Sequence, residues 1–203
     1  YIVAIAFMHI QSYVHTYIYT SPFLNEREMF FMSSFYKRFE MQLAFELSRE
    51  HETLPKAEVF ACLTALKVAY KEKIFSDGIL VIDTPLSPEP EVLTLLSRRL
   101  AMTHHIYEVK GMCVPDEMEI LGIVKKTDVA AVMKEGETFA VRMRGEHSTG
   151  VRRKNLPVIV GECIKRKGYA VNLEHPSQTF VLLFTAQTCL FGLLLQSVNK
   201  KQF

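Results

Sequence analysis

Apolar and polar residues follow regular patterns from Met41 onward, and these patterns predict alternating strands and helices. The run MQLAFEL at 41–47 alternates like a half-buried strand. Pro55 suits the first turn of a helix, because its missing N–H has no intrahelical partner there. A strand at ILVID, a helix at 92–101 and a strand at 105–109 follow. This β-α-β-α-β order predicts a ferredoxin-like α/β domain over residues 41–112.

A second domain is predicted over residues 113–198. Two short helices are expected at 116–125 and 128–134, with Thr127 as the N-cap of the second. They are followed by a strand at 138–144, a helix at 156–167, a short strand at 169–173 and apolar strands at 180–185 and 189–195. The fold class is therefore α/β (α+β) with two modules.

The apolar stretch FVLLFTAQTCLFGLLLQSV at 180–198 is long enough to cross a membrane if it were helical. Thr185, Gln187 and Thr188 interrupt it at the middle, which favours two buried strands instead. The apolar residues 1–10 lack a basic segment before them and a cleavage site after them. We therefore expect no membrane partner.

The two ends of the sequence differ from the domains between them. Residues 1–40 are rich in Tyr, Phe, Met and His without a clear period, and we treat them as an extension of uncertain status. Residues 199–203 return to polar character and suggest the start of a linker.

Charge is concentrated in one part of the chain. The formal net charge is only +2, yet residues 138–170 carry eight Lys and Arg side chains against two acids. Such a cluster on one unit predicts a surface for a polyanion, with nucleic acid the first candidate. The candidate RNA-binding residues are Arg142, Arg144, Arg152, Arg153, Lys154, Lys165, Arg166 and Lys167. The last three end a helix, where cations also stabilise the helix dipole, so a structural role is favoured for them.

Catalytic and metal-binding patterns are absent from the sequence. The four cysteines have no CxxC or paired-histidine spacing, which argues against zinc and favours reduced, intracellular thiols. Ser97, Ser148 and Cys163 have no identifiable base partner, so no catalytic residue is assigned. A Pro-Pro pair and a GxGxxG loop are also missing, so no cofactor-binding residue is assigned.

The second domain resembles a THUMP domain, the RNA-binding module of several tRNA-modifying enzymes. The resemblance rests on the strand Phe139-Ala140-Val141-Arg142, on Gly161, and on Val171-Asn172-Leu173-Glu174-His175-Pro176 with the apolar strands after it. It implies that the basic face binds the acceptor stem and 3′ end of tRNA, with Arg142, Arg152, Arg153 and Lys154 as the main contacts.

The first domain resembles the N-terminus of archaeal tRNA guanosine-N2 methyltransferases that act on the tenth nucleotide. Leu43 to Leu47, Leu54-Pro55 with Glu58, and Leu100 to His104 carry this similarity. It implies a cytoplasmic tRNA-docking part whose S-adenosylmethionine-binding catalytic domain follows in cis or acts in trans. A stand-alone RNA-binding adaptor is the main alternative. A sulfur-transfer tRNA enzyme and a structural or membrane-associated protein are less favoured.

Overall fold

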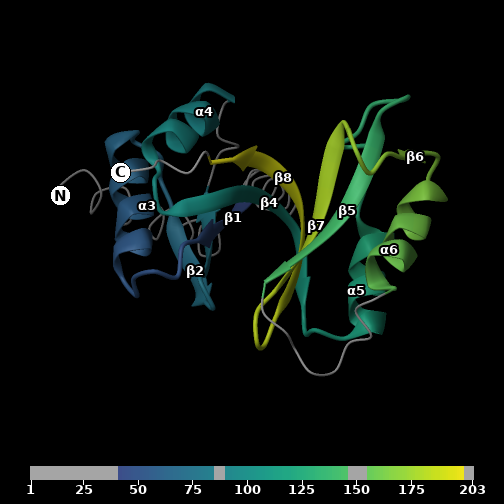
Figure 1. The fold of residues 1–203 in the computed structure, drawn as a ribbon, viewed down its shortest axis with the longest axis horizontal. Helices are drawn as coiled ribbons and strands as arrows, with labels where there is room; N and C mark the ends of the chain where they lie inside the picture. Colours follow the sequence, from purple (N-terminus) through teal and green to yellow (C-terminus); the bar gives the residue numbers. More distant parts are fainter. Residues whose placement is uncertain (1–40, 85–89, 146–154, 199–203) are drawn as a thin grey trace, which may run out of the picture. The chain divides into compact units, whose positions relative to one another are not determined.

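The computed structural model describes residues 41–84, 90–145 and 155–198, which belong to one compact unit. The described part is a mixed α/β fold built on one eight-stranded sheet (Figure 1). Its first elements are β1 (Met41–Leu47), α3 (Leu54–Ala65), β2 (Lys71–Ser76), β3 (Ile79–Thr84), α4 (Pro90–Arg99) and β4 (Thr103–Cys113). The later elements are α5 (Glu117–Lys126), β5 (Thr138–Gly145), α6 (Leu156–Lys165), β6 (Ala170–Val171), β7 (Gln178–Phe184) and β8 (Cys189–Ser197).

The strands follow the order β2-β3-β1-β4-β8-β7-β5-β6 across the sheet. β5 runs parallel to both β6 and β7, and the other neighbouring strands are antiparallel. β4 pairs with β8 from His105 to Cys113, so the strands of both predicted domains form a single sheet. The proposed boundary at residue 112 therefore falls within a strand, and the division into two domains stays a prediction.

The sequence pattern does not reveal β2, so the predicted β-α-β-α-β order is wrong by one strand. Its sequence KEKIFS is charged and largely exposed, because β2 lies at the edge of the sheet. Lysines on an edge strand hinder pairing with a further strand, and they also remove the apolar alternation that identifies a strand. The observed order of the first half is β-α-β-β-α-β.

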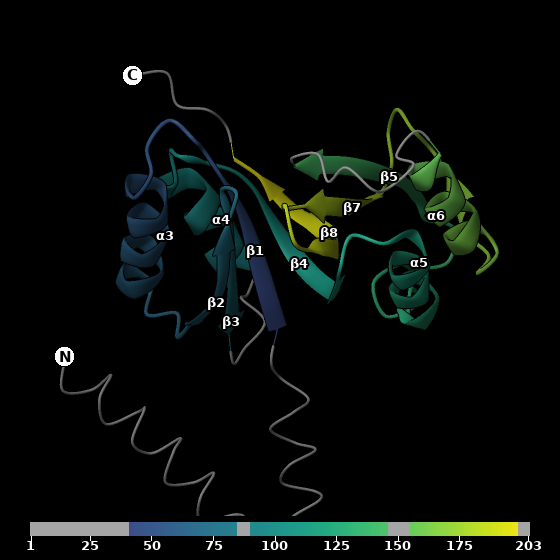
Figure 2. The ribbon, with the colours of Figure 1, turned by 90° about the horizontal axis from the view of Figure 1, so that it is seen from below.

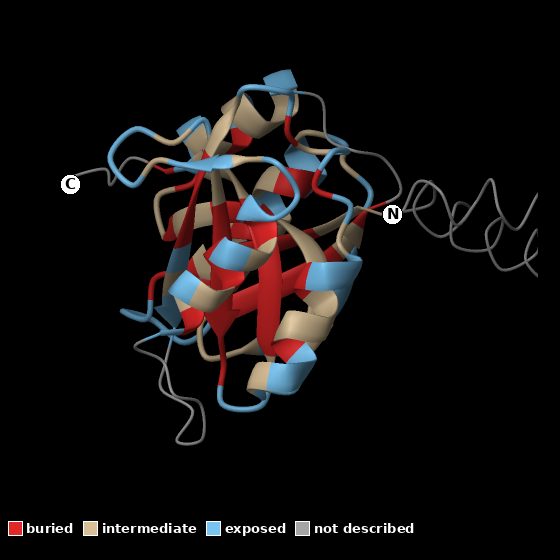
Figure 3. Ribbon diagram, turned by 90° about the vertical axis from the view of Figure 1, so that its right-hand side faces the viewer, coloured by how far each residue is buried: buried red, intermediate tan, exposed pale blue. Residues whose placement is uncertain are grey.

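All four described helices cover the same face of the sheet. α3 and α4 pack on Leu43, Phe45 and Ile82, whereas α5 and α6 pack on Phe139, Phe180 and neighbouring residues. Figure 3 shows buried residues along the strands behind the helices and on the helix sides turned toward them. Leu195 of β8 contacts both groups, so the two packed regions are continuous.

The opposite face of the sheet has no helix among the described elements, yet its centre is buried. The core of this helix-free face consists of Ala44, Ile79, Val81, Tyr107, Val181, Leu183 and Leu190. These side chains are at most 3% exposed, which agrees with a sheet that curls enough to bring Arg144 of β5 within 3.9 Å of Glu46 on β1. Figure 2 shows the strands changing direction between β1 and β5.

The helix predicted at 128–134 is absent, and that prediction was wrong. The backbone makes a single turn there, with the amides of Val132 and Met133 donating to the carbonyl of Val129. Thr127 ends α5 instead of starting a helix, since its hydroxyl donates to the carbonyl of Ile123. Asp116 is the cap that starts α5, accepting from the amides of Met118 and Glu119.

The apolar stretch at 180–198 forms β7 and β8, as its polar interruption predicted. Thr185 and Thr188 make the turn between them, with the Thr185 amide donating to the Thr188 carbonyl. Among the helices in the described ranges, none has the length and apolar character needed to cross a membrane.

Candidate nucleic-acid interface

Arg142 and Arg144 project from β5 on the side of the sheet without helices. Phe139 and Val141 of the same strand point toward α6, and alternation sends the two arginines the opposite way. Both arginines are exposed, and they lie two residues apart, so they share this face of the strand.

Arg142 is hydrogen-bonded to the loop that follows β6. Its guanidinium donates to the carbonyl of Leu173. The Asn172 side chain shapes the same loop, since its Oδ1 accepts from the amides of Glu174 at 3.1 Å and His175 at 3.0 Å. The loop is thus held by side chains from within it and from β5, and it presents Leu173 with 59% of its surface exposed.

Arg144 lies beside a carboxylate of the first half of the chain. Its Nη1 is 3.9 Å from Oε2 of Glu46 on β1, and the Tyr107 hydroxyl donates to the same oxygen at 2.6 Å. Burial, followed by the bond to Glu46, raises the pKa of Tyr107, so the phenol keeps its proton. Burial, followed by the positive charge of Arg144, lowers the pKa of the neighbouring His105.

The cations at the end of α6 have different surroundings from one another. Lys167 donates from Nζ to the carbonyls of Val124, Lys125 and Thr127, and thereby caps the end of α5. Lys165 lies 3.6 Å from Glu162 on its own helix, and Arg166 is exposed. Lys167 therefore has a structural role, but at the end of α5 and not at the end of its own helix as the sequence predicted.

The structure does not bring all the predicted RNA-binding residues onto one face. Thr138 pairs with Ala170, so α6 ends beside the first residue of β5, whereas Arg144 lies six residues further along the strand. That separation is roughly 20 Å at the rise of an extended strand. Arg152, Arg153 and Lys154, together with the neighbouring Ser148, lie outside the described residues.

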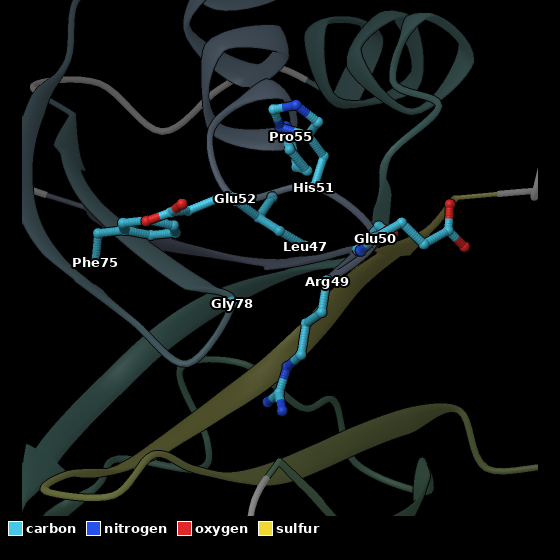
Figure 4. A pocket seen from close by; sticks show the side chains of 9 residues that line it. Leu47, Arg49, Glu50, His51, Glu52, Pro55, Phe75 and Gly78 are labelled. Atoms are coloured by element: carbon cyan, nitrogen blue, oxygen red, sulfur yellow. Dashed lines mark hydrogen bonds between the residues drawn. The ribbon is translucent and has the colours of Figure 1, made fainter.

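A pocket of about 340 Å³ lies at the opposite part of the unit, between the β1–α3 connection and the β2–β3 hairpin (Figure 4). Its apolar floor includes Leu47, Pro55 and Phe75. His51 caps α3 by accepting from the amides of Thr53 and Leu54, both at 3.2 Å. The Arg49 side chain points in the opposite direction from the His51 side chain. No group of three or more His, Cys, Asp or Glu suited to a metal occurs in the described ranges.

Sequence comparison relates this chain to a tRNA-modifying enzyme, although no family model matches it. It is 31% identical over 137 residues to the tRNA (guanine(10)-N2)-dimethyltransferase of Methanothermobacter thermautotrophicus. The matched region is 67% of this chain and 38% of that enzyme, so the chain spans less than half the length of its relative. The homology supports the predicted relationship to tRNA guanosine-N2 methyltransferases for this part of the molecule.

Solved structures share the fold at lower sequence identity. PH1313 from Pyrococcus horikoshii has a TM-score of 0.56 at 16% identity, covering 75% of this chain and 54% of that one. TrmN from Thermus thermophilus has a TM-score of 0.53 at 20% identity, covering 78% and 46%. SMU.472, whose structure contains SAH, has a TM-score of 0.55 at 12% identity, covering 76% of this chain and 41% of that one. At these identities the likeness establishes a shared mixed α/β fold.

Proposed function

We propose that this chain is the tRNA-binding part of a tRNA guanosine-N2 methyltransferase and that it holds the acceptor stem and 3′ end. The observation that carries the proposal is the 31% identity over 137 residues to the dimethyltransferase of Methanothermobacter. The function of this part is positional, because binding the tRNA end fixes which nucleotide reaches a catalytic domain. S-adenosylmethionine belongs to that catalytic domain, in cis or in trans.

We assign the first half to a ferredoxin-like domain and the second half to a THUMP domain. The β-α-β-β-α-β order, with β2-β3-β1-β4 as neighbours in the sheet, supports the first assignment. The ordered loop of Asn172 and Leu173, held by Arg142, supports the second. The two domains share one sheet through β4 and β8.

Electrostatic contact with phosphates accounts for the RNA affinity. Each neutralised phosphate releases condensed counterions, which favours binding without reading sequence. Arg142 and Arg166 are exposed cations on the described surface, and Arg152, Arg153 and Lys154 extend the proposed site. Arg144 and Lys167 contribute less directly, because Glu46 offsets the charge of Arg144 and three carbonyls engage the ammonium of Lys167, whereas Arg142 donates to a single neutral carbonyl.

The test is a titration of unmodified tRNA transcript at several salt concentrations. Replacing Arg152, Arg153 and Lys154 together by alanine should reduce the log–log salt slope by roughly 2–3. Lys56, Lys71 and Lys73 provide a matched triple-alanine control of equal charge on α3 and β2. A slope that falls only in the control would place the RNA surface on the first half and refute the proposed site.

A second measurement distinguishes a docking part from an independent adaptor. The chain is incubated with tRNA and labelled S-adenosylmethionine, alone and after fusion to a guanosine-N2 methyltransferase catalytic domain. A docking part should show methyl transfer in the fusion and none alone. If the fusion stays inactive although it binds tRNA, the adaptor is favoured over the docking part.

A further inference from the structure

Two polar contacts join strands that lie far apart in the sheet. β5 is the fourth strand from β1 in the order β1-β4-β8-β7-β5, so a flat sheet would separate them by roughly 19 Å. Arg144 of β5 nevertheless lies 3.9 Å from Glu46 of β1. Likewise, the amide of Ala186, between β7 and β8, donates at 2.8 Å to Asp77 between β2 and β3.

The Glu46 carboxylate has the surroundings of a fixed group. Its side chain is 18% exposed, and Tyr107, which is 1% exposed, donates to it from the core of the helix-free face. Arg144 retains 43% exposure of its side chain, so it is the more accessible partner. We call Glu46, Tyr107 and Arg144 the sheet clasp.

The sheet clasp is directly connected to the proposed RNA-binding surface. Arg142 precedes Arg144 by two residues on the same strand and face, and it holds the loop at Leu173. The position of β5 relative to β1 therefore also sets the position of this arginine and this loop.

We propose that Glu46 and Tyr107 are positioning residues for RNA binding, which act by holding Arg144 and with it the exposed face of β5. The inference rests on the proposed tRNA-binding function. A surface fixed before binding loses less conformational freedom when RNA docks, and this preorganisation increases affinity. Arg144 then serves RNA binding mainly through Glu46 and not as a phosphate contact of its own.

Replacing Glu46 by Gln separates this role from simple electrostatics. Gln keeps an acceptor for Tyr107 but removes the charge that attracts Arg144. Removing an acid from an RNA-binding surface should strengthen binding if only charge matters. The sheet clasp predicts the opposite sign, with tRNA affinity about two- to fivefold lower, the range of a partly exposed ion pair.

The matched control is Glu135→Gln, because Glu135 is an exposed acid outside the sheet clasp. It should leave tRNA affinity unchanged or slightly higher. The double variant E46Q/R144Q should bind tRNA no more weakly than R144Q alone, because both changes remove the same ion pair while the glutamine amide at position 46 still accepts from Tyr107. An E46Q variant with unchanged or higher affinity, or a double variant in which the two losses simply add, would overturn the inference.

Amide hydrogen exchange at Ala186 provides a readout without RNA. If the sheet clasp holds the curl, E46Q should speed exchange at this amide, which bonds to Asp77 across the same curl. Unchanged exchange would overturn the structural part of the inference. If the wild-type chain bound no tRNA, the proposed function would fail, and the exchange result would still decide whether the sheet clasp exists.

Discussion

The absence of a side chain at Gly192 permits the close pairing of β4 and β8. A Cβ atom built there would lie 2.6 Å from the carbonyl oxygen of Glu108, where ordinary contacts begin at 3.4 Å. The obstacle is backbone in the centre of the sheet and not the end of a flexible side chain. Gly192→Ala would therefore require β4 or β8 to move by several tenths of an ångström.

We expect Gly192→Ala to lower the free energy of unfolding by about 2 kcal/mol, within the range of overpacked interiors. For a unit of this size, the melting temperature should fall by roughly 4–8 °C. Scanning calorimetry of the wild type and the variant measures this shift. Gly122→Ala is the matched control, because a Cβ in α5 at that position meets nothing within 4 Å.

The control should stabilise the protein by about 0.5–1 kcal/mol, since alanine favours a helix over glycine. If Gly192→Ala lowers the free energy of unfolding and Gly122→Ala raises it, the close approach of β4 to β8 is supported. If Gly192→Ala melted at or above the wild-type temperature, the backbone contact would be refuted.

Three further predictions test other parts of the structure. Leu183→Ala should lower the free energy of unfolding by about 3 kcal/mol, because this side chain is 0% exposed in the core of the helix-free face. Urea denaturation measures this difference, and a loss of less than about 1 kcal/mol would contradict the packing. Lys167→Ala should cost about 1 kcal/mol by uncapping α5, whereas Arg166→Ala should leave the melting temperature unchanged and weaken tRNA binding. Because the pKa of His105 is lowered in the folded protein, the imidazole is protonated in the unfolded chain before it is protonated in the folded one as pH falls below about 6.5. Stability should therefore decline in that window more for the wild type than for His105→Asn, and parallel melting curves against pH would refute the assignment.

The sequence predicts elements best where burial imposes a strong period. β1 is predicted by the alternation of its apolar residues, and β7 and β8 are predicted by the polar interruption that divides a continuous apolar run. The sequence does not reveal β2, and it wrongly predicts a helix at the turn of 128–134, for opposite reasons. The edge strand carries charges that conceal it, while Val129 and Met133 are buried in a single turn and imitate a helical spacing.

The candidate interface was predicted only in part, because charge composition does not reveal direction. The eight cations are near one another in sequence, but alternation along β5 and the path of α6 distribute the described ones over different surfaces. Glu46 and Tyr107 were not singled out, since their contact with Arg144 depends on the curl of the whole sheet. The alternation of residues in β1 and β4 shows which face of the sheet each side chain occupies. No local pattern shows which side chain of a distant strand it will contact on that face.

The pairing of β4 with β8 also has a consequence for how the chain acquires its structure. His105 pairs with Ser197, a partner 92 residues later, so this pairing of strands cannot form until that segment has been synthesised. Until β8 is available, one edge of β4 lacks its final neighbour, and such open edges promote misassociation. Contacts so distant in sequence also slow folding, because the chain loses the entropy of closing a long loop before the contacts can stabilise it. We therefore expect the first half to complete its folding after translation of β8 and not as an independent early unit.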